Sequence, residues 1–327
     1  MNTKALARGA LARLGIKPVP LAVGFEITHQ CNLACGYCDR HTKLPNEMTC
    51  EQIFAALAEL VELGMAHTSL DGGEPLTHPN IAEVVDFLLA REVQVYMNTN
   101  GKLIPRKLDV VRKLSKVKIS MDGPREAHDA MRGTGAFDKA IAGARAAREV
   151  GVEVALTCVV GTHNADHIDE LIDFVEAERL PIIFQPARPS LFLDGQNRDA
   201  TWVLEADLLR QTLAHIARRR RDCKYIANGW ASLRHFRAFP NDKKLPCAAG
   251  WINVTMDPEG NLYHCGQVSR LVRKHNVVRL GARRAFESLE RRGCAQCWCA
   301  RVVEENYAWG GRILQMLPPV RALEPAG

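Results

Sequence analysis

Short apolar runs alternate with amphipathic stretches along the first 186 residues of the chain. Ala22–Thr28 is apolar and rich in residues that favour strands, whereas Glu51–Leu63 repeats its apolar positions with a helical period. The alternation continues and predicts strands at 68–70, 93–98, 117–121, 152–160 and 182–185, and helices at 81–90, 107–114, 136–150 and 166–178. Strands that alternate with helices pair in parallel through right-handed crossovers. The pattern therefore predicts an α/β fold, a partial (β/α)6 parallel barrel.

The pattern changes after Pro186. Helices are expected at 202–221 and 228–239, and the turn sequence DPEG at 257–260 stands between two β-rich runs that predict a hairpin. A last helix is expected up to Leu317, where two prolines follow. The predicted parts are a helical N-terminal extension at 1–21, the barrel at 22–200, a helical connector at 201–244, a small α+β domain at 245–300, and a C-terminal helix and tail at 301–327.

Composition narrows the class of protein. The 327 residues are 47% apolar and contain no run long enough to cross a bilayer. The formal charge of +6 is spread along the chain, so we expect no nucleic-acid partner. Lys4–Leu14 is expected to be a basic amphipathic helix that packs on the barrel rather than on a membrane. Eleven cysteines without a secretory signal predict a cytoplasmic protein whose clustered thiols bind metal or do chemistry.

The first cysteine cluster is CNLACGYC, which follows the first predicted strand. Cys31, Cys35 and Cys38 supply three thiolates, and an iron-sulfur cluster held by three thiolates keeps one iron open to a small molecule. Other distinctive segments also follow strand ends: DGGEP at 71–75, NTNG at 98–101, SMDG at 120–123 and FQPAR at 184–188. In a parallel barrel the working residues sit at the C-terminal ends of the strands. These segments are therefore expected to line one mouth.

A second group of cysteines lies near the C-terminus. Pairing about the DPEG turn brings Cys265 back towards Cys247, and Cys294 and Cys297 follow a short helical stretch. Four thiolates in two separated pairs fit a structural zinc site or an iron-sulfur cluster, and the spacing alone favours zinc. Cys299 is an alternative ligand, a thiol hydrogen donor or a buried residue without a role.

The Cys-x-x-x-Cys-x-x-Cys loop, with Tyr37 before its last cysteine and GGEP after the second strand, resembles the radical S-adenosylmethionine (SAM) enzymes. The resemblance covers Ala22 to Pro186, through SMDG and the HDAMRG of His128–Gly133. It implies a 4Fe-4S cluster on Cys31, Cys35 and Cys38, whose open iron chelates the amino and carboxylate groups of SAM.

The resemblance also implies contacts to SAM. Glu74 is expected to accept hydrogen bonds from the SAM amino group, and Gly72 and Gly73 to let the backbone approach the cofactor. Arg132 is expected to pair with the SAM carboxylate or to form a structural salt bridge. The remaining candidates are Tyr37 at the adenine, and Asn98, Ser120 and Gln185 at the ribose or methionine.

The second cysteine group is similar to the twitch domain, a shortened form of the SPASM module. SPASM supplies about seven cysteines for two auxiliary clusters, whereas five cysteines fall here. The resemblance therefore implies one auxiliary 4Fe-4S cluster on Cys247, Cys265, Cys294 and Cys297, and it lowers the weight of zinc. The C-terminal part is accordingly expected to be an iron-sulfur domain.

The resemblance implies reductive cleavage of SAM to methionine and a 5′-deoxyadenosyl radical, which removes a hydrogen atom from substrate. A flavodoxin or ferredoxin is expected as electron donor. The favoured substrate is a small polar metabolite that undergoes dehydrogenation, epimerisation or decarboxylation, because the chain is short and one auxiliary cluster is expected. A ribosomal-peptide maturase is the alternative, disfavoured because only about twenty residues precede the first strand. A noncatalytic zinc or iron-sulfur protein and an enzyme with a lipid-like substrate are further alternatives.

Overall fold

The computed structural model describes residues 9–10, 12–13, 17–38, 46–187, 201–238, 247–266, 274–290, 297 and 299–317. Most of the predicted N-terminal helix and the proposed ligand Cys294 lie outside these residues. Within the described helices, none combines the length and the apolar character that a membrane span requires.

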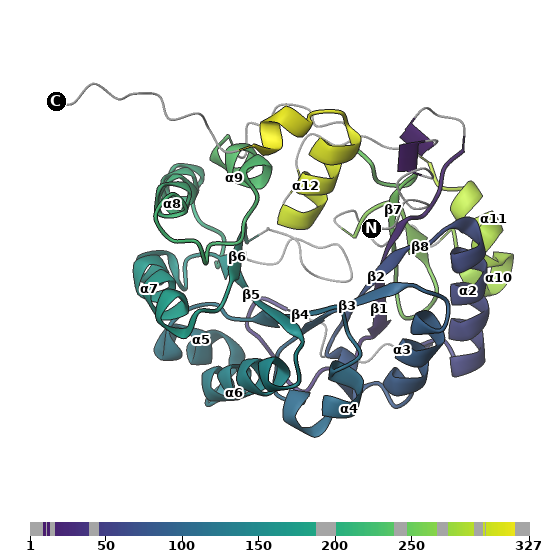
Figure 1. Cartoon of the computed structure of the whole chain (residues 1–327), viewed down its shortest axis with the longest axis horizontal. Coiled ribbons are helices and arrows are strands. Elements are labelled where there is room, and N and C mark those ends of the chain that lie inside the picture. Colours follow the sequence, from purple (N-terminus) through teal and green to yellow (C-terminus); the bar gives the residue numbers. More distant parts are fainter. Residues whose placement is uncertain are drawn as a thin grey trace.

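One eight-stranded sheet forms the centre of the molecule, in the order β6-β5-β4-β3-β2-β1-β7-β8 (Figure 1). Strands β1 to β7 are parallel to their neighbours, and β8 is antiparallel to β7. The six strands predicted for the barrel are all present, so the predicted partial (β/α)6 barrel is confirmed. The strands are β1 (Ala22–Thr28), β2 (His67–Gly72), β3 (Gln94–Thr99), β4 (Lys116–Ser120), β5 (Glu153–Val160), β6 (Ile182–Pro186), β7 (Asn253–Met256) and β8 (Leu262–Tyr263).

Helices cover the outer face of the curved sheet (Figure 1). The helices of the described residues are α2 (Cys50–Leu63), α3 (Ile81–Leu89), α4 (Leu108–Val111), α5 (Arg125–Arg132), α6 (Ala136–Glu149), α7 (Ile168–Glu178), α8 (Ala206–Arg219), α9 (Trp230–Arg237), α10 (Val277–Leu280), α11 (Ala282–Glu287) and α12 (Ala300–Trp309). The sequence analysis did not predict α5, because its strongly polar sequence REAHDAMR lacks an apolar stripe.

Helix α2 shows why these segments form where the sequence indicates. Thr49 and Gln52 make a capping box at its start, and Gly64 ends it in the left-handed conformation with φ 116°. Between these signals, Ile53, Leu57 and Leu60 are fully buried on one face. They pack in the same core as the outward-facing strand side chains, so the barrel is apolar outside and free to be polar inside.

The predicted hairpin about DPEG is present as β7 and β8, but it belongs to the barrel sheet. Residues 253–256 of β7 pair in parallel with residues 22–25 of β1. Helix α12 then lies across the side of the barrel between β6 and β7 (Figure 1). The C-terminal part of the chain therefore extends the barrel wall and covers its open side.

Candidate active site

The cysteine loop and the C-terminal ends of the strands enclose a cavity of about 650 Å³. Cys31, Cys35 and Cys38 all line it, as the position of the loop after β1 predicted. The loop is held to α5 by a hydrogen bond from Gly36 N to Met131 O of 3.0 Å, and Cys38 N donates to Cys35 O at 3.0 Å. Three soft thiol donors thus face one cavity, which is the donor set that an iron-sulfur cluster requires.

The two glycines of GGEP permit a close approach of protein backbone. A Cβ atom on Gly72 would lie 2.3 Å from the Thr28 carbonyl oxygen, and one on Gly73 would lie 2.3 Å from the Gln30 carbonyl oxygen. Gly73 N and the next residue's N donate to these same two carbonyls at 2.8 Å. The glycines also line the cavity. Their first structural effect is to fasten β2 to the segment that enters the cysteine loop.

Glu74 is fully buried and braces β2 against β3. Its Oε1 accepts hydrogen bonds from Thr99 Oγ1 at 2.7 Å and Leu76 N at 3.2 Å, and its Oε2 accepts from Asn100 N at 2.8 Å. Burial raises the pKa of the Glu74 carboxyl, and these hydrogen bonds oppose the rise. Although the neighbouring residues line the cavity, Glu74 lies behind the described lining. One remaining acceptor position on Oε2 is compatible with a further donor.

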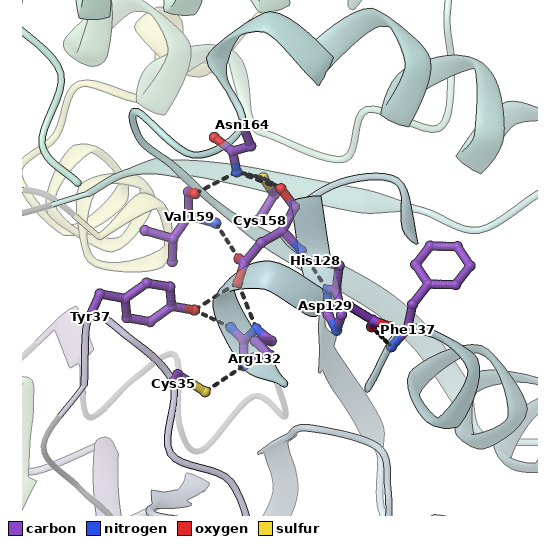
Figure 2. Close-up of polar contacts among 10 residues, drawn as sticks. Cys35, Tyr37, His128, Asp129, Arg132, Phe137, Cys158, Val159 and Asn164 are labelled. Atoms are coloured by element: carbon purple, nitrogen blue, oxygen red, sulfur yellow. Dashed lines mark hydrogen bonds and ion pairs between the residues drawn. The ribbon is translucent and has the colours of Figure 1, made fainter. Parts of the chain in front are cut away.

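Arg132 forms a buried ion pair with Asp122 (Figure 2). Arg132 Nε lies 2.6 Å from Asp122 Oδ2, which also accepts from the Tyr37 hydroxyl at 2.9 Å. Burial would raise the pKa of Asp122, but the Arg132 guanidinium holds it below its usual range. Arg132 Nη2 donates to Tyr37, and Arg132 Nη1 lies 3.9 Å from Cys35 Sγ. The pair therefore stands directly behind the cysteine loop.

Asp122 is the residue of this network that the sequence analysis missed. Its Oδ1 accepts from Val159 N at 3.2 Å, and its backbone N–H donates to Nδ1 of His128 at 3.1 Å (Figure 2). Asn164 Nδ2 donates to the Asp122 carbonyl at 2.5 Å. The signal was present as the carboxylate of SMDG, ten residues before Arg132, but only the serine of that motif was selected.

The three other predicted SAM contacts occupy the barrel interior. Asn98, Ser120 and Gln185 all line the cavity. Asn98 Nδ2 is already bonded to the Asp71 carboxylate and to Ser69 Oγ, the latter at 3.2 Å. Tyr37 lines the same cavity, although its hydroxyl is occupied by Asp122 and Arg132.

The second cysteine group is partly brought to this cavity. Cys265, beyond β8, and Cys299, at the start of α12, line it together with the three cysteines of the first loop. Cys247 is half-buried before β7, and its carbonyl accepts a hydrogen bond from Trp251 Nε1 at 2.8 Å. Cys297 is buried, and its carbonyl lies 3.0 Å from His235 Nε2.

Burial raises the pKa of two thiols in the first loop. It raises the pKa of Cys35 to about 11, although Arg132 acts in the opposite direction, and it also raises the pKa of Cys31. Thiolates at these positions therefore need a positive partner, and cluster irons supply one. The donor set and its shared cavity fit a 4Fe-4S cluster.

Residues 25–175 match the model of the Radical SAM superfamily, and the chain carries a domain of that family. The match confirms the resemblance that the cysteine loop and GGEP carried. The cofactors of this family are a 4Fe-4S cluster and SAM, as expected.

Individual relatives match different fractions of the chain. The Fe-coproporphyrin III synthase of Methanosarcina barkeri is 33% identical over 174 residues, 51% of this chain and 43% of its own length. The PqqA peptide cyclase of Gluconobacter oxydans is 29% identical over 265 residues, 75% of this chain and 70% of its own length. The solved structure of anSMEcpe with bound AdoMet and Cp18Cys peptide has a TM-score of 0.64 at 18% identity, and the match covers 90% of this chain and 98% of that one.

Proposed function

We propose that this protein is a radical SAM enzyme that modifies a ribosomally made peptide. The observation that carries the proposal is the extent of the likeness to the PqqA peptide cyclase, which reaches past the barrel to 75% of the chain. The porphyrin-related synthase matches only half of the chain. The anSMEcpe structure, whose fold is shared, holds a peptide.

The prediction of a small polar metabolite as substrate and partner is wrong, because the PqqA peptide cyclases, whose match reaches beyond the barrel, act on a peptide. The prediction relied on the short segment before β1 and on a cysteine count below that of SPASM. Neither feature describes the cavity in which the reaction occurs. A cavity of about 650 Å³ that several strands and α12 line can receive one residue of a longer chain beside a cofactor.

When bound, the cluster and SAM supply a 5′-deoxyadenosyl radical that removes a hydrogen atom from substrate. The protein then has two tasks. Cys31, Cys35 and Cys38 hold the cluster, with Arg132 beside Cys35, and α12 covers the side of the barrel and limits the access of water. Whether the net reaction is an oxidation or an elimination follows from what happens to the peptide after the hydrogen atom leaves. We propose oxidoreductase chemistry, since the second cysteine group offers an electron acceptor beside the cavity.

We propose that this second group is a twitch module that binds one auxiliary 4Fe-4S cluster on Cys247, Cys265, Cys294 and Cys297. The support is that Cys265 and Cys299 share the cavity of the first loop. Anaerobic reconstitution is then expected to give about eight irons per chain, and about four after Cys265→Ala. About four irons and one zinc in the unsubstituted protein would contradict the auxiliary cluster.

The proposed function is tested with short peptides encoded beside the gene. The reconstituted enzyme is incubated anaerobically with SAM, a reduced flavodoxin or ferredoxin, and each peptide in deuterated form. A changed peptide mass together with deuterium in 5′-deoxyadenosine is the expected result. If the peptides stay unchanged while deuterium passes from a small metabolite, the proposal fails. Cys35→Ala is the matched control for reactions that do not need the cluster.

A further inference from the structure

A row of polar side chains crosses the inner face of the barrel. Strand register places Glu26 beside Asp71 and Asn98 beside Lys118, and the bond from Asn98 to Asp71 joins the two halves. All four residues line the cavity that the cysteine loop also lines. The row thus presents charged groups where a substrate residue would enter.

Lys118 differs from the other two cations that line the described part of the cavity. Arg132 is paired with Asp122, and Arg301 is paired with Glu305. Within the described residues, the Lys118 ammonium has no hydrogen-bond acceptor and no ion-pair partner. Its ammonium therefore faces the cavity without a bound counter-ion, an arrangement that costs free energy unless a ligand compensates it.

The nearby carboxylates do not fill this role. Oδ1 of Asp71 already accepts from Asn98 and from Ser69 Oγ, the latter at 3.2 Å, and burial raises the pKa of Asp71. Across the cavity, Glu305 Oε2 accepts from Asn253 Nδ2 at 3.0 Å, while its Oε1 is bound to Arg301. Burial and then Arg301 lower the pKa of Lys118, whereas Cys299 and Asp71 act in the opposite direction. An anion bound beside the ammonium would compensate its charge.

We propose that Lys118 binds a carboxylate of the substrate residue that undergoes modification, either an Asp or Glu side chain or the C-terminal carboxylate of the peptide. The inference rests on the proposed function, because it names the kind of peptide residue that the cavity accepts. The contact would be a charge-assisted hydrogen bond formed where water is limited. It fixes one end of the residue in the barrel, below the cysteine loop at the strand ends.

Small probes test the contact without requiring the peptide or turnover. N-acetylglycine represents a terminal carboxylate and N-acetylglycinamide is its neutral counterpart. N-acetylglutamic acid α-amide represents a side-chain carboxylate and N-acetylglutamine α-amide is its counterpart. Each is titrated by saturation-transfer NMR into the full chain, loaded with clusters and with SAM present so that the open iron is occupied.

At least one acid is expected to bind about tenfold more tightly than its amide. Lys118→Met should bring the ratio of the amide's dissociation constant to the acid's close to one. Lys118→Arg should keep most of the preference for the acid. Lys113→Met is the matched control, because Lys113 is an exposed lysine paired with Asp86, and it should leave the ratio unchanged. Lys118→Gln serves as a second neutral variant if Lys118→Met does not take up iron.

The acid that is preferred identifies the source of the carboxylate. Equal binding of acids and amides by the unsubstituted protein, or an unchanged ratio in a folded neutral variant, would overturn the inference. Failure of the proposed function gives a different result, since a protein that prefers the acids but never modifies a peptide would disprove only the peptide chemistry.

Discussion

At the scale of single residues, Asp122 organises the rear of the cysteine loop. It joins α5 through Arg132, the loop through Tyr37, and β5 through Val159 N. Its carboxylate is fully buried, so each of these partners replaces a hydrogen bond to water. The position of the loop thus depends on a charge that has no direct contact with the cysteines.

Asp122→Asn should destabilise the protein by about 3 kcal/mol, because it leaves the Arg132 guanidinium buried without its counter-charge. The free energy of unfolding from urea denaturation of the cluster-free protein measures this loss. The matched control is Asp138→Asn, which breaks the exposed pair of Asp138 with Arg125 and should cost less than about 1 kcal/mol. Equal losses of unfolding free energy in the two variants would show that the buried ion pair contributes no more to stability than the exposed one.

His128 predicts a pH dependence of stability. Burial, opposed by Asp122, lowers the pKa of His128 from 6.5 to about 4. The unfolded chain therefore takes up a proton at a higher pH than the fold does, so stability is complete above pH 6.5 and falls as the pH drops towards 4. Protonation of His128 alone should lower the free energy of unfolding by about 3 kcal/mol over this pH range.

His128→Asn, whose side-chain oxygen can replace Nδ1 as acceptor for Asp122 N–H, should flatten the curve between pH 6.5 and 4. Unfolding free energies at a series of pH values measure the effect. His167→Asn changes an exposed histidine and should follow the unsubstituted protein. A His128→Asn curve parallel to that of the unsubstituted protein would rule out the buried neutral imidazole.

At the scale of elements, the approach of β2 to the end of β1 sets the geometry of the cysteine loop. Gly73 packs its α-carbon against backbone, and backbone cannot move aside as a flexible side chain can. The hydrogen bonds from Gly73 and Glu74 to residues 28 and 30 exist only because this approach is allowed. GGEP is thus a structural requirement of the loop as well as part of the cavity lining.

Gly73→Ala should displace the loop and lower iron uptake at the first site to less than half, because its Cβ would lie 2.3 Å from the Gln30 carbonyl oxygen. Iron and sulfide content after reconstitution, with the second site removed by Cys265→Ala, measures this uptake. Gly24→Ala provides the comparison, since its Cβ would meet Thr255 Oγ1 at an ordinary 3.5 Å. Full iron content in Gly73→Ala would contradict the packing argument.

At the scale of the whole molecule, the local sequence pattern was sufficient to predict the strands and helices of the barrel, but it was insufficient to predict the arrangement of its interior. The short apolar runs of β1 to β6 and the helical period in α2 or α7 are local properties, so the strands and helices could be predicted from sequence. The pairing of β7 with β1 joins residues more than 200 positions apart, and nothing in either segment specifies it. The hairpin was therefore predicted, but its place in the barrel sheet was not.

The site was predictable to the same extent. The spacing of Cys31, Cys35 and Cys38 is sufficient to predict them as a group. The partner of Arg132 depends on where α5 lies, and α5 has no apolar stripe from which it could be predicted. Lys118 gives no signal in the sequence either, because only the register of β4 shows that it faces inward beside Asn98. The proposed substrate class depends on the relatives that match beyond the barrel.

The most direct measurement tests the proposal that Cys31, Cys35 and Cys38 bind a 4Fe-4S cluster and leave one iron open for SAM. The anaerobically reconstituted protein is reduced with dithionite in the presence of SAM, and 5′-deoxyadenosine is quantified for the unsubstituted protein, for Cys35→Ala and for Cys223→Ala, a buried cysteine outside both groups. We predict 5′-deoxyadenosine from the unsubstituted protein and from Cys223→Ala, and none above background from Cys35→Ala. Undiminished 5′-deoxyadenosine production by Cys35→Ala would contradict the assignment of the cysteine loop as the radical-generating site.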